Sequence, residues 1–152
     1  MNEGDAAPDF ELAASDGSIV RLGSFKGQKK VVLCFYPKNH LFACPSKKVF
    51  KMAEATIKAY PKIKEQNAEL FAVSVDTVED QKKFVGEYQV PYLHLSDPQK
   101  VACKQYAGLN IAGLAKRSTF VIGKDGKVAK IFRDVNVESH GQEIIQALQS
   151  LD

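Results

Sequence analysis

The stretch Val31–Val49, VVLCFYPKNHLFACPSKKV, decides the fold. Its first six residues, Val31–Tyr36, are apolar and rich in β-branched and aromatic side chains, which is typical of a strand buried on both faces. After a short polar loop, Cys-Pro-Ser at 44–46 opens a pattern in which apolar residues recur every three or four positions as far as Ile63. Pro45 suits the first position of a helix, because its missing N–H would have no partner there. The stretch therefore predicts a buried strand, a loop and a helix.

Cys44 falls at the point where this loop passes into the helix. The unpaired N–H groups and the positive end of the helix dipole at such a position stabilise a thiolate and lower the pKa of a cysteine thiol. Lys47 and Lys48, in the first turn, add positive potential near the sulfur. Cys44 is therefore the candidate reactive group of the stretch.

The composition is that of an ordinary folded protein, with 152 residues of which 45% are hydrophobic and 26% charged. We expect one domain spanning 1–152. A net charge of +3 carried by scattered lysines is too small to indicate nucleic-acid binding. No apolar run approaches the roughly 18 residues that cross a bilayer, and the acidic, polar N-terminus does not fit a signal peptide.

The cysteines indicate a reducing compartment. There are three of them, an odd number, and they show neither a CxxC pair nor the spacing of metal ligands. We therefore expect no metal or cofactor and a cytoplasmic location. A mature organellar protein whose transit peptide has been trimmed is the alternative.

Turn signals and apolar patterns divide the chain into alternating strands and helices. A hairpin is predicted around Ser15-Asp16-Gly17 and another around Gly-Lys-Asp-Gly at 123–126. Between them the patterns predict strands at 31–36, 68–75 and 92–95 and helices that begin near 45, 77 and 98, with a last helix at 139–151. This order predicts a three-layer α/β/α domain with a mixed central sheet and an N-terminal β-hairpin.

Several helix ends can be predicted from single residues. Thr77 is expected to cap the second helix, and Asp97-Pro98 to open the third with Pro at its first position. Ser139 with Gln142 three residues later reads as a capping box for the last helix. Pro61 should end or kink the first helix near Tyr60.

Four stretches then match a known family in order and spacing: APDFELAASDG (7–17), FYPKNHLFAC (35–44), SDPQKVACKQYAG (96–108) and RSTFVIGKDGKV (117–128). The chain resembles the peroxiredoxins, which have a thioredoxin-like fold, and among them the peroxiredoxin Q or bacterioferritin-comigratory branch. The resemblance covers almost the whole chain. Its active-site loop is atypical, as described below.

The resemblance implies a thiol-dependent peroxidase that reduces hydrogen peroxide and organic hydroperoxides, with thioredoxin or another thiol as reductant. Cys44 would be the peroxidatic thiolate, which attacks one peroxide oxygen and becomes a sulfenic acid. Arg117 would donate hydrogen bonds to peroxide and thiolate, and Pro37 would shield the thiolate from water. The family also implies a monomer or homodimer.

Two positions depart from the family pattern. Where the family carries Thr three residues before the reactive Cys, this chain has Leu41, which can neither donate nor accept a hydrogen bond. The loss of one such contact costs roughly 10²–10³ in rate. Where the branch usually carries Glu three residues after the Cys, this chain has Lys47. We therefore expect an easily ionised Cys44 with attenuated peroxide chemistry.

A partner cysteine that would resolve the sulfenic acid is also missing from its usual place in this branch, five residues after Cys44, where this chain has Val49. Cys103 is the remaining candidate, and it would need local unfolding to come within disulfide range. The simpler interpretation is a one-cysteine cycle with an external thiol. Cys34, inside the apolar strand, is interpreted as core packing.

Two other hypotheses remain open. The departures at Leu41, Lys47 and Val49 would also fit a catalytically weakened redox sensor or partner-binding module on the same fold. A thiol–disulfide oxidoreductase is disfavoured, because that chemistry needs a nearby cysteine pair.

Overall fold

The structure, a computed structural model, describes residues 1–39, 47–133 and 139–151, with the side chains of 47–52 excepted. Seven strands, four α-helices and one 3-10 turn occupy these residues. In chain order they are β1 (Glu11–Ala14), β2 (Ile19–Arg21), η1 (Leu22–Phe25), β3 (Lys30–Phe35), α1 (Lys47–Glu65), β4 (Ala68–Ser74), α2 (Val78–Tyr88), β5 (Leu93–Ser96), α3 (Val101–Gln105), β6 (Ser118–Ile122), β7 (Val128–Arg133) and α4 (His140–Gln149).

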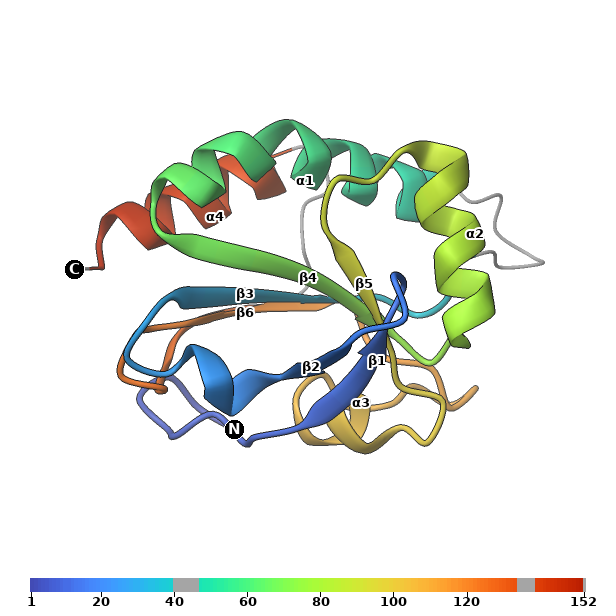
Figure 1. Ribbon diagram of the computed structural model, residues 1–152. Helices are drawn as coiled ribbons and strands as arrows, with labels where there is room; N and C mark the ends of the chain where they lie inside the picture. Colours follow the sequence, from blue (N-terminus) through green and yellow to red (C-terminus); the bar gives the residue numbers. More distant parts are fainter. Residues whose placement is uncertain (40–46, 134–138, 152) are drawn as a thin grey trace.

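The strands form one mixed sheet in the order β2-β1-β5-β4-β3-β6-β7. β3, β4 and β5 run parallel, while β6 and β7 on one side and the β1–β2 hairpin on the other join antiparallel. Helices α1, α2 and α4 cover one face and α3 lies on the other (Figure 1). The predicted α/β/α arrangement with an N-terminal hairpin is therefore confirmed.

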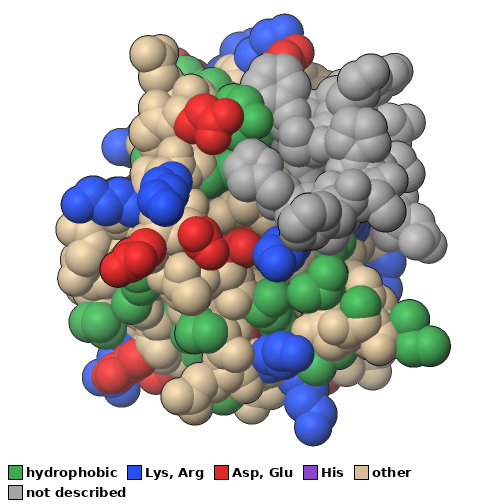
Figure 2. All heavy atoms as spheres, turned by 90° about the vertical axis from the view of Figure 1, so that its right-hand side faces the viewer, with side chains coloured by type: hydrophobic (Ala, Val, Ile, Leu, Met, Phe, Trp, Pro, Cys, Tyr) green, Lys and Arg blue, Asp and Glu red, His purple; other side chains and the backbone are tan. Residues whose placement is uncertain are grey.

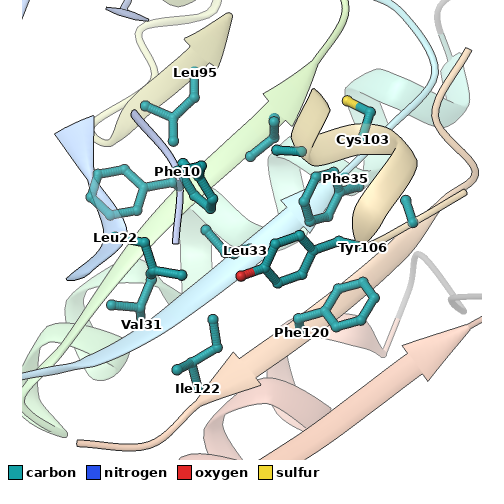
Figure 3. Close-up of a cluster of buried hydrophobic side chains, with 14 of the residues drawn as sticks. Phe10, Leu22, Val31, Leu33, Phe35, Leu95, Cys103, Tyr106, Phe120 and Ile122 are labelled. Atoms are coloured by element: carbon teal, nitrogen blue, oxygen red, sulfur yellow. The ribbon is translucent and has the colours of Figure 1, made fainter. Parts of the chain in front are cut away.

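β3 lies at the centre of the fold, and all six of its residues are buried, as its sequence predicts. Because side chains alternate along a strand, it contributes to two separate apolar clusters. Val31, Leu33 and Phe35 belong to the cluster on the α3 face, which Figure 3 shows. The residues between them belong to the cluster beneath α1, α2 and α4.

Pro61 does not end the first helix, which was one of the two outcomes predicted for it. α1 continues through it to Glu65. The ring lies on the exposed side of the helix, and Ile63 beyond it is fully buried. Proline removes one backbone hydrogen bond, and here burial of the next apolar residue offsets that loss.

Two details of the predicted helix starts also need correction, the first residue of α3 and the capping bond of α4. α3 begins at Val101 rather than at Pro98, although the Asp97 carboxylate still caps it by accepting from the N–H groups of Val101 (3.0 Å) and Cys103 (2.7 Å). Ser139 precedes α4 but makes no capping bond, because its hydroxyl donates to the Glu143 carboxylate instead. The Thr77 cap of α2 is confirmed, with a bond of 3.2 Å from the Asp80 N–H.

Among the described residues, no helix combines the length and the apolar character needed to cross a bilayer. On the face that carries α2, acidic and basic side chains are interspersed with hydrophobic ones (Figure 2).

Candidate functional site

The end of β3 brings together two of the predicted site residues. Pro37 follows the strand closely and is buried. β6 runs antiparallel to β3 with Ser118 opposite Phe35, so Arg117, which precedes Ser118, lies beside the point where β3 ends. Arg117 is partly exposed. The sheet register therefore places these two residues, which are distant in the sequence, at the same end of neighbouring strands.

The other residues of the predicted active-site loop are described incompletely or not at all. Cys44 and Leu41 lie outside the described residues. Lys47 and Val49 are described only as part of the α1 backbone, which begins at Lys47. The geometry that can be described is therefore that of the strand ends on either side of the Cys44 loop.

A second guanidinium lies at the same end of the sheet. Arg133 ends β7 directly opposite Ser118. Its guanidinium carbon lies 5.4 Å from the centre of the Phe120 ring, and one terminal nitrogen donates to the Ala107 carbonyl at 3.4 Å. Sequence analysis missed this residue, because its pairing with Ser118 depends on an irregular register between β6 and β7, which includes a shift at Val121/Ile122.

Cys34 is a buried, neutral thiol, as predicted. It is 3% exposed and belongs to the cluster beneath the helices. Burial raises the pKa of Cys34 to about 12, against a smaller opposing effect of its hydrogen bond with Thr119. Such a thiol remains protonated and takes no part in chemistry near neutral pH.

Cys103 is equally inaccessible. It lies in α3 with no exposed surface, next to the aromatic cluster of the α3 face (Figure 3). Burial raises the pKa of Cys103, and the nearby Asp97 carboxylate raises it further. In this state the thiol is neither exposed nor ionised, so a resolving role requires the unfolding of α3.

The largest finding beyond the sequence prediction is a buried polar network around Gln81 of α2. Gln81 has no exposed surface. Its Nε2 donates to Ser74 Oγ (2.8 Å) and to the Leu95 carbonyl (3.0 Å), at the ends of β4 and β5. Its Oε1 accepts from Asn39 Nδ2 (3.0 Å) and faces the Tyr36 hydroxyl (3.0 Å). One amide therefore joins two parallel strands, β4 and β5, to the segment that follows β3.

Asp76, in the loop between β4 and α2, binds the backbone of the same segment through its side chain. The carboxylate Oδ2 accepts from the Asn39 N–H at 2.9 Å and from the Ser74 hydroxyl at 2.6 Å. Asp76 is 5% exposed and Asn39 2% exposed. The Asn39 side chain also donates to the Asp80 carbonyl at 3.3 Å. Both the backbone and the side chain of Asn39 are thus fixed.

The network also determines the tautomer of His94. The Tyr36 hydroxyl contacts Asn39 Oδ1, Gln81 Oε1 and His94 Nδ1, the last at 2.8 Å. Because the two amide oxygens can only accept, most contacts are satisfied when the single hydroxyl proton goes to one of them and His94 donates from Nδ1. Burial lowers the pKa of His94 to about 3, so the ring is neutral.

The sequence carried a signal for this network that was not used. Gln81 precedes Phe84, Val85 and Tyr88 by three, four and seven positions, so it occupies the apolar face of its helix. A polar residue on such a face must find buried partners. No comparable signal marks Asn39 or Asp76, which lie in loops. Among the described residues, no group of three or more His, Cys, Asp or Glu side chains could hold a metal ion.

The chain is similar in sequence and in structure to proteins of one known family. A family model described as the AhpC/TSA family matches residues 3–131. The chain is 34% identical to the chloroplastic Peroxiredoxin Q of Populus jackii, over 99% of this chain and 70% of that one. It is 33% identical to Peroxiredoxin Bcp of Bacillus subtilis, over 97% and 95%. The crystal structure of the peroxidoxin BcpB from Mycobacterium tuberculosis superposes with a TM-score of 0.85 at 28% identity, covering 99% of this chain and 97% of that one.

Proposed function

Because this chain belongs to the AhpC/TSA family, we propose that Cys44 is the peroxidatic cysteine through which it acts as a thiol-dependent peroxidase. The class of enzyme, a peroxiredoxin and hence an oxidoreductase, follows from its relatives, which match it over nearly its whole length. The proposal concerns which residues carry out the reaction and how fast it runs.

In the proposed reaction the Cys44 thiolate attacks one oxygen of a hydroperoxide ROOH. An S–O bond forms as the O–O bond breaks, so the sulfur becomes a sulfenic acid and RO⁻ leaves, to be protonated to the alcohol or, for hydrogen peroxide, to water. Arg117 donates hydrogen bonds to the peroxide and the thiolate, and Pro37 keeps water away from the sulfur. The observation that carries this assignment is the β3–β6 register, which brings Arg117 to the end of the strand that leads into the Cys44 loop.

The sulfenic acid is then reduced by an external thiol, in a one-cysteine cycle. A first thiol displaces water to give a mixed disulfide, and a second thiol displaces the Cys44 thiolate. The burial of Cys103 supports this cycle over an internal disulfide. Thioredoxin is the proposed reductant, with another cellular thiol as the alternative, and we propose a single domain over 1–152, working as a monomer or homodimer in the cytoplasm.

Stopped-flow mixing with hydrogen peroxide and with an organic hydroperoxide tests the assignment. Wild-type protein and Cys103→Ser should consume peroxide far faster than free cysteine, and Cys44→Ser should not. Mass spectrometry after one equivalent of peroxide should place the added oxygen on Cys44. A Cys44 that reacts no faster than free cysteine, or oxidation at Cys34 or Cys103 first, would overturn the assignment.

We further propose that Leu41 attenuates the reaction, because it lacks the hydroxyl that the family uses at this position. Leu41→Thr should then raise the rate constant for peroxide by about 10²–10³. A rate that does not change would mean that Leu41 is harmless. If the wild type is nearly inert and only Leu41→Thr reacts, the second candidate function, a redox-sensing or partner-binding module, becomes the better description.

A further inference from the structure

We propose that Gln81 is a positioning residue for the peroxide reaction, which fixes Tyr36 and Asn39 on either side of Pro37 and so holds the start of the Cys44 loop in its reactive arrangement. This inference rests on the function proposed for Cys44. Gln81 does not touch the reacting atoms in this account. It acts through the segment 36–39.

The donor bonds of Gln81 establish where its amide oxygen must point. Nε2 is held by Ser74 Oγ and the Leu95 carbonyl, both of which lie at strand ends in the centre of the sheet. Oε1 is therefore directed at the segment after β3, where it accepts a hydrogen bond from Asn39 Nδ2. The orientation of the amide leaves no alternative, because reversing it would set NH₂ against NH₂ at Asn39 and oxygen against oxygen at Leu95.

The segment held in this way is short and is anchored at both ends. Tyr36 and Asn39 are separated by only Pro37 and Lys38, and both contact Gln81 Oε1. Asp76 adds the bond to the Asn39 N–H, which belongs to the backbone itself. Proline fixes its own φ, so with Tyr36 anchored before it and Asn39 anchored two residues after it, the ring of Pro37 has little freedom left.

Such restraint matters for rate more than for stability. A reacting group displaced by about 1 Å can lose roughly 10²-fold in rate, whereas one buried hydrogen bond makes only a modest net contribution to stability. If Gln81 were merely a satisfied core residue, its removal would lower the melting temperature and leave Cys44 chemistry in the folded protein unchanged. The two roles are therefore separable by experiment.

The test compares Gln81→Leu and Asn39→Ala with wild-type protein at 25 °C, under conditions in which circular dichroism shows each to be folded. Both variants should lower the second-order rate constant of Cys44 with hydrogen peroxide by about tenfold or more. Both should also shift the pH midpoint of Cys44 alkylation by iodoacetamide upward. Asn39→Ala removes the loop end of the bond and keeps Gln81 with Ser74 and Leu95, so it covers the case in which Gln81→Leu does not fold.

Thr77→Ala is the matched control on the same helix. It removes an exposed capping bond one turn before Gln81 and should lower stability without altering the rate or the alkylation midpoint. Asp76 offers a rescue: Asp76→Ala should slow the reaction, while Asp76→Asn, whose amide oxygen can accept both bonds made to Oδ2, should restore most of the rate.

The outcomes distinguish this inference from the function on which it depends. If wild-type Cys44 reacts rapidly and both Gln81→Leu and Asn39→Ala react equally fast, the positioning role is overturned and the peroxidase assignment stands. If wild-type Cys44 itself is inert toward peroxide, the proposed function fails first, and an unshifted alkylation midpoint in both variants would overturn the positioning role as well.

Discussion

The two faces of the sheet differ in chemistry where β3 ends. On the α3 face, Phe35 stacks on Tyr106 with ring centres 5.5 Å apart and meets Phe120 edge-to-face at 5.7 Å. On the face beneath the helices, Tyr36, the next residue along, places its hydroxyl among amide and imidazole groups of Gln81 and His94. The last residue of β3 and the residue after it therefore support an aromatic core on one side and a polar network on the other.

This difference indicates a division of labour. Apolar packing is roughly proportional to buried area and tolerates small displacements, whereas hydrogen bonds fix distances and directions. The aromatic face should therefore dominate stability, and the polar face should fix the geometry of the segment that leads to Cys44. If so, a change on one face should leave the property governed by the other face unaltered.

The largest effect is expected from acid, and between pH 6.5 and 5 it acts through two histidines of the helix-covered face. Burial lowers the pKa of His94 to about 3 and that of His140 to about 4, so both rings stay neutral in the folded protein well below pH 6.5. Below that pH the unfolded chain binds two protons that the folded chain does not. Stability is therefore complete above pH 6.5 and falls towards pH 4, by about 1.4 kcal/mol per unit for each histidine.

Denaturant titrations between pH 6.5 and 5 measure this slope with little contribution from carboxylates. His140→Gln should retain one of the two buried rings and so halve the slope, whatever its effect on absolute stability. A stability that is flat over this range in the wild type would contradict the buried, neutral state of both rings.

The next effect belongs to the aromatic face. Leu33 is fully buried in the cluster of the α3 face, near the middle of β3. Leu33→Ala should lower the free energy of unfolding by about 2–5 kcal/mol, from lost burial and the cavity that remains. Peroxide reactivity of the folded variant should be unchanged. A large fall in that reactivity would show that the two faces are coupled through β3.

Apolar packing on the two faces of the sheet could be predicted from the sequence more fully than polar contacts could. The apolar run Val31–Tyr36 was sufficient to predict a central strand buried on both sides, because hydrophobic patterning reports burial directly. Spacing and order were also sufficient to predict the hairpin that carries Arg117. Both follow from local pattern plus a known family arrangement.

Helix ends and polar partners were less predictable, because they depend on tertiary contacts. Pro61 lies inside α1 since burial beyond it outweighs a lost backbone bond. Ser139 has a capping sequence, yet its hydroxyl donates a hydrogen bond to the Glu143 carboxylate and not to the helix backbone. Asn39 and Asp76 are in contact only because β3 and β4 are neighbours in the sheet. The sequence of neither loop contains a pattern that predicts this contact.

A smaller effect compares one hydroxyl on each face. Tyr36→Phe removes a buried hydroxyl that contacts two amide oxygens and His94 Nδ1, and should cost about 1–3 kcal/mol because partners are left unsatisfied. Tyr106→Phe is the matched control. Its hydroxyl donates to one partly buried acceptor, the Pro8 carbonyl, and its loss should cost about 1 kcal/mol or less. Chemical denaturation of both variants measures the difference, and equal losses would mean that the polar network adds nothing beyond a single bond.

The smallest expected effect tests whether an exposed hydrogen bond of α2 influences peroxide reactivity as strongly as the buried ones do. Thr77 is exposed and caps α2 through one bond of 3.2 Å to the Asp80 N–H, so Thr77→Ala should cost about 1 kcal/mol of stability. Because solvent can replace that bond, the position of Gln81 one turn later should not change. Denaturant titration should record the loss while stopped-flow reaction with peroxide records none. A fall in the rate constant with Thr77→Ala as large as that with Gln81→Leu would mean that the stability of α2 as a whole, rather than the buried amide, sets the geometry at the end of β3.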